Sequence, residues 1–163
     1  MMTQFDFGDG PVPAHQHPNG GGWVADTAYV SDTAYVGLNA QVSGNARVSG
    51  DAWVSGQARV FDRARVSRSA EVYGDAWVSG QARVSRSAEV YGRAWVSGQA
   101  RVSGNARVFD NARVFDRARV YGNTWVSGNT RVSGDARVSG NTQVSGDAQV
   151  SGDAQVSGDT VMT

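Results

Sequence analysis

The sequence predicts an all-β protein: a triangular solenoid of short strands that stack in coils of 18 residues. Valine occupies every sixth position from Val24 to Val156, which places 23 valines in phase. Two residues before each valine, from Val30 on, stands an Ala or a Thr. Residues 74–91 and 92–109 also match as consecutive blocks of 18. A fixed short period sets the architecture before any other signal is read.

Each six-residue unit is interpreted as a short strand followed by a corner. The pair Ala-x-Val has a period of two, so both side chains lie on one face of a strand. One such strand cannot bury its Val and Ala alone, so the units must wind and stack. Three units close a triangle of 18 residues, which gives about 7–8 coils over the repeat. The chain has 21 Gly and a single Leu, a composition unsuited to helices.

The corners are predicted at the position two residues after each valine. Of 23 such positions, 15 are Gly and five are Asp, residues that tolerate a positive φ. The remaining three, Leu38, Arg68 and Arg86, are expected to mark turns of a different conformation.

The chain divides into residues 1–22, an irregular N-terminal cap, and residues 23–163, the solenoid. Phe5 and Phe7 alternate in the cap and are expected to cover the end of the first coil. Because proline cannot donate to a ladder, the cap is not expected to extend a sheet. The prolines concerned are Pro11, Pro13 and Pro18.

The tandem pattern aliphatic-x-x-x-small-x, carried by runs such as "VSGNARV" and "GDAWVSG", resembles the hexapeptide repeat of left-handed parallel β-helix proteins. This resemblance covers residues 24–162, and the left-handed coiling is taken from the family. The same runs resemble solenoid proteins encoded by bacteria and their phages. The family commonly forms trimers, and it includes acyltransferases and γ-type carbonic anhydrases.

The positions that carry catalysis in that family are not matched here. The family's acyltransferases use a His on or beside a coil, and its anhydrases need three. This chain has only His15 and His17, both before the repeat, and it has no Cys. Glu71 and Glu89, each three residues after an Arg, are interpreted as a charge-compensated surface pair. We expect no catalytic residue, no cofactor and no enzyme; a hexapeptide-type acyltransferase is the remote alternative.

The His-x-His of "AHQHPNG" is a weak metal candidate, because two ligands are too few for a closed site. It resembles the apex motif of some phage spike trimers, where a symmetric oligomer completes the set. Solvated histidines in a polar cap are the more frequent explanation of such a pair.

Positions 18 apart lie above one another, so outward residues form rows along the rod. On the first face, the position before valine forms a column of six arginines at about 4.8 Å spacing. One interpretation is a strip that binds anions, because guanidinium groups suit phosphate, sulfate and carboxylate. The other is that the Arg stems cover apolar strand surface and were copied by duplication. The column comprises Arg47, Arg65, Arg83, Arg101, Arg119 and Arg137.

The second and third faces carry outward aromatic residues. They either stack to hold the sheet together or mark an interaction surface. Lateral association, such as a trimer, is one way to cover them. The candidates are Trp53, Trp77, Trp95, Trp125, Tyr73, Tyr91 and Phe109.

These features predict a structural or interaction protein that self-associates, laterally or end to end through the C-terminal coil. The alternative is a protein that binds or sequesters a polyanion or a phosphorylated small molecule through the arginine column. Fifteen Arg balance fifteen Asp and Glu, so nucleic acid is not expected. The first residues lack an apolar core, so we expect no signal peptide, no membrane partner, and a cytoplasmic protein or one on a particle assembled there.

Overall fold

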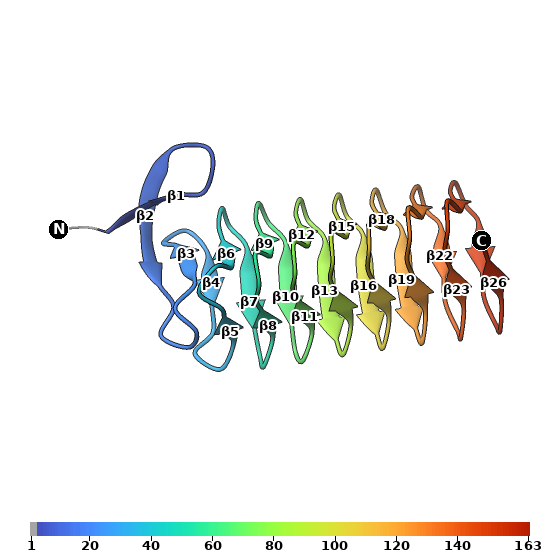
Figure 1. Cartoon of the computed structure of the whole chain (residues 1–163), viewed down its shortest axis with the longest axis horizontal. Helices are drawn as coiled ribbons and strands as arrows, with labels where there is room; N and C mark the ends of the chain where they lie inside the picture. The colour runs from blue at the N-terminus through green and yellow to red at the C-terminus, as the bar shows by residue number, and fades with distance from the viewer. Residues whose placement is uncertain (1–2) are drawn as a thin grey trace.

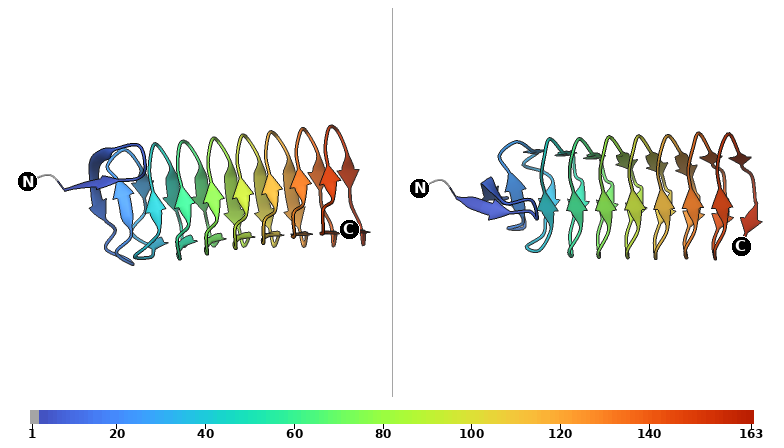
Figure 2. Two further views of the ribbon diagram at one scale, coloured as in Figure 1. Left: turned by 45° about the horizontal axis from the view of Figure 1, so that its top comes forward. Right: turned by 90° about the horizontal axis from the view of Figure 1, so that it is seen from above.

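The computed structural model describes residues 3–163, which form one rod of stacked coils without a helix (Figure 1). The strands lie in three sheets that run the length of the rod, and the chain visits the sheets in turn (Figure 2). Neighbouring strands of the solenoid are parallel and pair residues 18 apart, as Val66 pairs with Val84. The predicted β-solenoid with 18 residues per coil is therefore confirmed. Its left-handed sense stays a prediction.

The first sheet has eight strands and carries the arginine column. It comprises β4 (Tyr29–Val30), β7 (Arg47–Ser49), β10 (Arg65–Ser67), β13 (Arg83–Arg86), β16 (Arg101–Gly104), β19 (Arg119–Gly122), β22 (Arg137–Val138) and β25 (Gln155–Val156).

The second sheet also has eight strands. It comprises β5 (Tyr35–Val36), β8 (Trp53–Val54), β11 (Glu71–Val72), β14 (Glu89–Val90), β17 (Arg107–Val108), β20 (Trp125–Val126), β23 (Gln143–Val144) and β26 (Val161–Met162).

The third sheet has ten strands, because an N-terminal hairpin joins it. It comprises β1 (Gln4–Asp6), β2 (Pro11–Gln16), β3 (Trp23–Ala25), β6 (Gln41–Val42), β9 (Arg59–Val60), β12 (Trp77–Val78), β15 (Trp95–Val96), β18 (Arg113–Val114), β21 (Arg131–Val132) and β24 (Gln149–Val150).

The core is a continuous column of small aliphatic side chains. Every in-phase valine from Val36 to Val144 is fully buried, and the alanines two positions earlier lie beside them. Each buried valine contributes about 1.5–3 kcal/mol before the cost of ordering the chain. Thr124, Thr130 and Thr142 take the alanine position, and their hydroxyl groups donate to carbonyl oxygens three residues earlier. The inward orientation predicted for Val and Ala is confirmed, and the three Thr residues at the alanine position share it.

The corners adopt the positive φ that the glycine pattern predicts. All 15 corner glycines and three of the five corner Asp residues have φ between 59° and 87°. The prediction that Arg68 and Arg86 mark a different turn is wrong, because their φ values are 64° and 67°. The stacked neighbours impose one conformation on the corner, and these arginines adopt it. Leu38 does depart from it, together with Asp26 and Asp32 in the first coils.

The N-terminal cap is more regular than predicted. β1 pairs with β2, and β2 pairs with β3, both in the antiparallel sense. The prediction that proline keeps this segment out of the ladder is wrong. Proline lacks an N–H but keeps its carbonyl, and Pro13 accepts a hydrogen bond from the Asp26 amide at 3.0 Å.

The cap also covers the first strand of the second sheet. Val36 donates its amide to the carbonyl of Asn19 at 3.0 Å, and Gly22 donates to the carbonyl of Val36 at 2.9 Å. A Cβ on Gly22 would stand 2.3 Å from the Gly37 carbonyl oxygen, so this approach needs glycine.

Phe5 and Phe7 do not cover the end of the core as expected. Phe5 stacks on the outward ring of Trp23 with 4.5 Å between centroids, and Phe7 meets Phe5 edge-on at 4.9 Å. The buried residues among positions 3–22 are instead Ala14, His17 and Gly22.

Candidate functional site

The six predicted arginines form one column on the first sheet. Strand register places them in line, from Arg47 on β7 to Arg137 on β22. All six side chains are exposed, and within residues 3–163 none of them forms an ion pair with a carboxylate. The positive charge of the column is therefore not compensated by carboxylates, and the neighbouring guanidinium groups repel one another at this spacing. Whether it binds an anion stays a prediction.

Five aromatic residues on the face of the second sheet form two separate stacks. Tyr35 and Trp53 stack with 3.8 Å between ring centroids. Tyr73, Tyr91 and Phe109 stack at 4.8 and 4.9 Å with nearly parallel rings. These three rings are partly covered, so their stacking contributes to the cohesion of the sheet.

Glu89 joins these rings to a charge network. The Tyr73 hydroxyl donates to Glu89 Oε2 at 3.4 Å, and Glu89 Oε1 pairs with Arg107 Nη2 at 3.2 Å. Arg107 in turn lies over the ring of Trp125, with its Cζ 5.5 Å from the centroid. Burial and the negative charge of Glu89 raise the pKa of Tyr73 to about 12. The predicted compensation by the preceding arginine is wrong for both residues. Glu89 pairs with Arg107 one coil further on, and Glu71 forms no ion pair within residues 3–163.

The third sheet carries a pair of stacked indole groups with a guanidinium group on each side. Trp77 and Trp95 stack at 5.0 Å with an interplanar angle of 3°. Arg59 covers Trp77 and Arg113 covers Trp95, at 5.3 and 5.4 Å from the centroids. The two guanidinium groups are attracted to the ring faces by cation–π interaction. Of the row, Trp95 remains 42% exposed.

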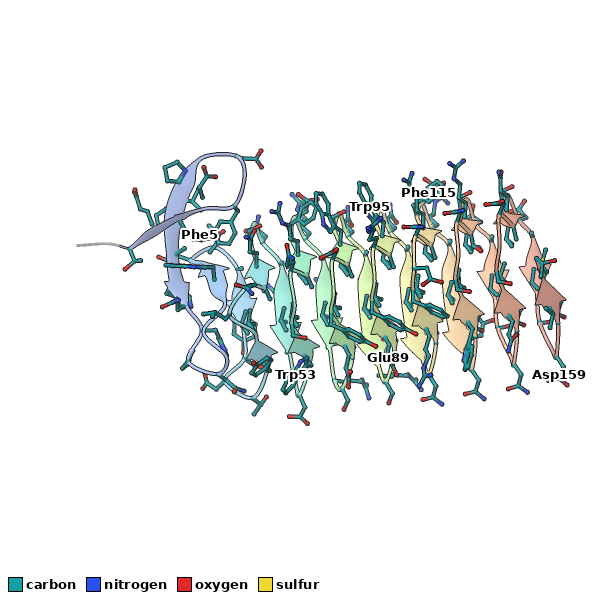
Figure 3. All side chains as sticks on the ribbon, viewed as in Figure 1. Phe5, Trp53, Glu89, Trp95, Phe115 and Asp159 are labelled. Atoms are coloured by element: carbon teal, nitrogen blue, oxygen red, sulfur yellow. The ribbon has the colours of Figure 1, made fainter. Side chains whose placement is uncertain are left out.

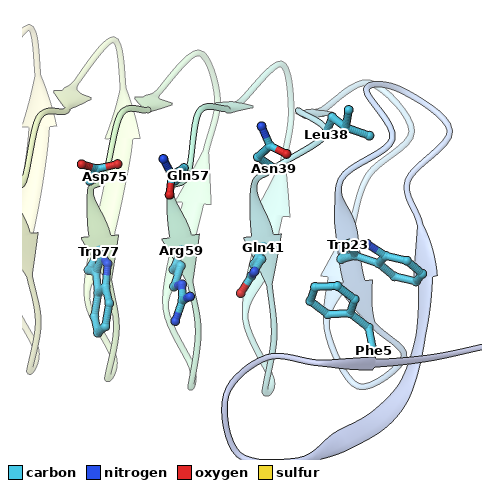
Figure 4. A pocket seen from close by; sticks show the side chains of 9 residues that line it. All are labelled: Phe5, Trp23, Leu38, Asn39, Gln41, Gln57, Arg59, Asp75 and Trp77. Carbon is cyan, nitrogen blue, oxygen red and sulfur yellow. The ribbon is translucent and has the colours of Figure 1, made fainter.

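A cavity of about 690 Å³ lies beside this stack, at the N-terminal end of the third sheet (Figure 4). Phe5 and Trp23 close one end, and Trp77 stands at the other. Its remaining lining comes from Leu38, Asn39, Gln41, Gln57, Arg59 and Asp75. This cavity was not predicted from the sequence, although the 18-residue register places most of its lining residues in two adjacent rows.

Trp95 and Trp53 project on different sides of the rod (Figure 3). Trp53 on the second sheet is 45% exposed, and Trp125 on the same sheet is 43% exposed. The predicted interaction residues therefore form two groups. Trp53, Trp95 and Trp125 are exposed, whereas Trp77, Tyr73, Tyr91 and Phe109 are partly covered.

Two ladders of side-chain amides were also not predicted from the sequence. Asn105, Asn123 and Asn141 form a chain of hydrogen bonds at 3.0 Å that ends on Asp159 at 2.9 Å. A parallel ladder begins at Asn111. Their signal is the repetition of Asn at intervals of 18, and they tie the corners of the later coils together.

The two histidines take separate partners. His15 Nδ1 lies 2.9 Å from Asp26 Oδ1, whereas the buried His17 accepts a hydrogen bond from the Asn19 amide at 3.3 Å. In the described part of the chain, no three His, Asp or Glu residues gather as metal ligands would. Residues 3–163 also contain no helix that could cross a membrane.

The fold and the repeat define the chain as a β-solenoid repeat protein. The family described as YdcK Beta solenoid repeat matches it in five segments, residues 40–56, 100–114, 112–128, 131–146 and 148–163. These segments lie within the solenoid and together span somewhat less than half of the chain. No curated protein matches the chain.

Proposed function

We propose that this chain is a non-enzymatic structural and interaction protein, a rigid solenoid that presents a binding surface and self-associates. We also propose that the chain is similar to the left-handed hexapeptide-repeat proteins of bacteria or phages. The same proposal locates it in the cytoplasm or on a particle assembled there. The stacked coils support rigidity, because each coil is bonded to both neighbours along three sheets.

One observation carries the proposal: large aromatic side chains stand exposed on a flat, regular frame. Trp53 and Trp125 on the second sheet each expose more than two fifths of their surface. Tryptophan is enriched at the centres of protein interfaces, where its ring is desolvated. The second sheet is accordingly the face that we propose for lateral association.

The test is the mass of the purified chain by light scattering over a range of protein concentrations. We expect a defined oligomer. The double variant Trp53→Gln, Trp125→Gln should shift it to the monomer, whereas Leu38→Gln, which changes an exposed apolar residue away from this face, should not. A wild-type monomer at every concentration would contradict self-association.

End-to-end association is the second mode within this proposal. The strands β24, β25 and β26 are the last members of their sheets, and their outer edges hold no neighbouring strand in the described chain. Ser157→Pro removes an N–H from this edge. If that variant dissociates the oligomer and the tryptophan double variant does not, the rods associate through their ends.

A second candidate function is the binding of a linear polyanion along the arginine column. Its support is the line of six exposed arginines without an ion-pair partner among the described residues. Retention on immobilised heparin should fall as salt rises, and fall further in the double variant Arg83→Gln, Arg101→Gln. Equal retention of that variant and the wild type would contradict this function.

A further inference from the structure

Two arginines occupy backbone positions that suit glycine. Arg68 and Arg86 have φ values of 64° and 67°, in the left-handed region that β-carbons disfavour. Other corners of the same column are glycines, including Gly50 before the pair and Gly104 after it. The stacking is tight, since a Cβ on Gly50 would stand 3.0 Å from the Arg68 Cα. Side chains kept at strained positions point to a function.

The two arginines line a groove along one corner of the rod. The cavity has a volume of about 450 Å³ and lies where the first sheet turns into the second. Ser69 and Ser87 add hydroxyl groups, which can donate to an anion. The full lining is Arg68, Ser69, Arg86, Ser87, Gly104 and Asn105.

The charge of this groove is uncompensated. Within residues 3–163, neither Arg68 nor Arg86 forms an ion pair. Of the two nearby carboxylates, Glu89 is engaged by Arg107 at 3.2 Å and Glu71 pairs with neither arginine. Guanidinium groups bind phosphate through paired N–H donors.

The size of the cationic corner limits the ligand. Arg68 and Arg86 are equivalent residues of adjacent coils, so their backbones are about 4.8 Å apart. Along the corner, the residue equivalent to Arg68 and Arg86 is Gly50 on the coil before the pair and Gly104 on the coil after it. The positive segment is therefore two coils long, which suits two neighbouring phosphate groups rather than a polymer.

We propose that the Arg68–Arg86 corner is a binding site for a small molecule that carries two adjacent phosphate groups. This site is independent of the self-association and of the arginine column proposed above, because Arg68 and Arg86 belong neither to the second-sheet face nor to the column.

The test is titration calorimetry with inorganic pyrophosphate on the full chain. We expect saturable binding of one pyrophosphate per chain, with orthophosphate binding at least about tenfold more weakly because it engages one arginine only. The double variant Arg68→Gly, Arg86→Gly should lose at least about tenfold in affinity. Glycine relieves the positive φ, so this variant should resist urea better than the wild type while it loses the ligand.

The matched control is Arg131→Gln, which removes one exposed arginine from the third sheet. It should bind pyrophosphate as the wild type does. Absence of saturable binding at millimolar pyrophosphate overturns the proposal. So does a loss of binding free energy in Arg131→Gln that is about half of the loss in the double variant, because each arginine removed would then weaken binding equally and binding would follow net charge. Equal affinity for orthophosphate and pyrophosphate refutes the paired-phosphate geometry.

Discussion

The corner at Gly80 offers a direct measure of what the stacked turns require. Its φ is 65°, and a Cβ there would meet the Gly98 carbonyl oxygen at 2.9 Å and the Gly98 nitrogen at 3.0 Å. Alanine at this φ costs about 1–2 kcal/mol. Displacing the neighbouring backbone costs about 1–3 kcal/mol more, whereas the reduced conformational freedom of the unfolded chain stabilises the variant by about 0.4–1 kcal/mol. We expect Gly80→Ala to destabilise the fold by about 2–4 kcal/mol.

Aspartate at the same position should cost less than alanine. Asp62 and Asp116 occupy equivalent corners, and each carboxylate accepts the amide of the next coil's glycine, at 2.9 and 3.0 Å. In Gly80→Asp the new carboxylate can accept the Gly98 amide in the same way. We expect this bond to recover about 1 kcal/mol relative to Gly80→Ala.

Urea unfolding followed by circular dichroism measures both variants, with Gln81→Ala as the control at an adjacent exposed residue. Midpoints are comparable only where the slope of the transition is unchanged, because long repeat arrays can lose cooperativity. A Gly80→Ala midpoint equal to that of wild type would refute the argument that stacking forbids a Cβ. An aspartate variant as unstable as the alanine variant would refute the role of the carboxylate.

Three further predictions concern the core, the ionisation of one ring and the cap. Val84→Ala removes two methyl groups from a fully buried site and should cost about 2 kcal/mol, whereas Val156→Ala, at a partly exposed site near the end of the sheet, should cost less in the same urea assay. Because the pKa of Tyr73 is raised from 10.0 to about 12 in the folded chain, the folded state holds this proton more tightly than the unfolded state. Stability should therefore fall as pH rises from about 10 to about 12, and Tyr73→Phe should weaken that fall; identical pH profiles of the urea midpoint would contradict the assignment. Phe5→Ala removes the ring stacked on Trp23 at 4.5 Å, so amides of β1 and β2 should exchange hydrogen faster while those of the central strands do not. Unchanged exchange in the hairpin would show that its backbone hydrogen bonds hold it in place without the ring.

The rows of the surface were predictable because they follow from the register alone. Once Val66 is known to lie over Val84, every residue 18 apart falls into line, and the arginine column follows without further information. The contacts between side chains within a row were not predictable. The periodicity places Glu89, Arg107 and Trp125 in one row, but the pairing of Glu89 with Arg107 depends on side-chain reach.

The errors arose where a residue's own preference was taken as decisive. Proline does not donate to a ladder, yet β2 pairs with β1 and β3, and the carbonyl of Pro13 accepts the Asp26 amide. Arginine disfavours a positive φ, yet Arg68 and Arg86 adopt it because the coils above and below have the same turn. In both cases a neighbour that is distant in sequence set the conformation.

The sequence by itself determined the architecture of this protein: a buried side chain every two residues within a strand, a corner every six residues and a coil every 18. A period that short leaves one way to bury the valines, which is to stack the strands. The tertiary structure alone decided how the N-terminal segment closes the first coils, which cations meet which rings, and where the surface is hollowed. These features depend on contacts between residues with no fixed spacing, and their free energies come from side-chain geometry that a repeat pattern does not encode.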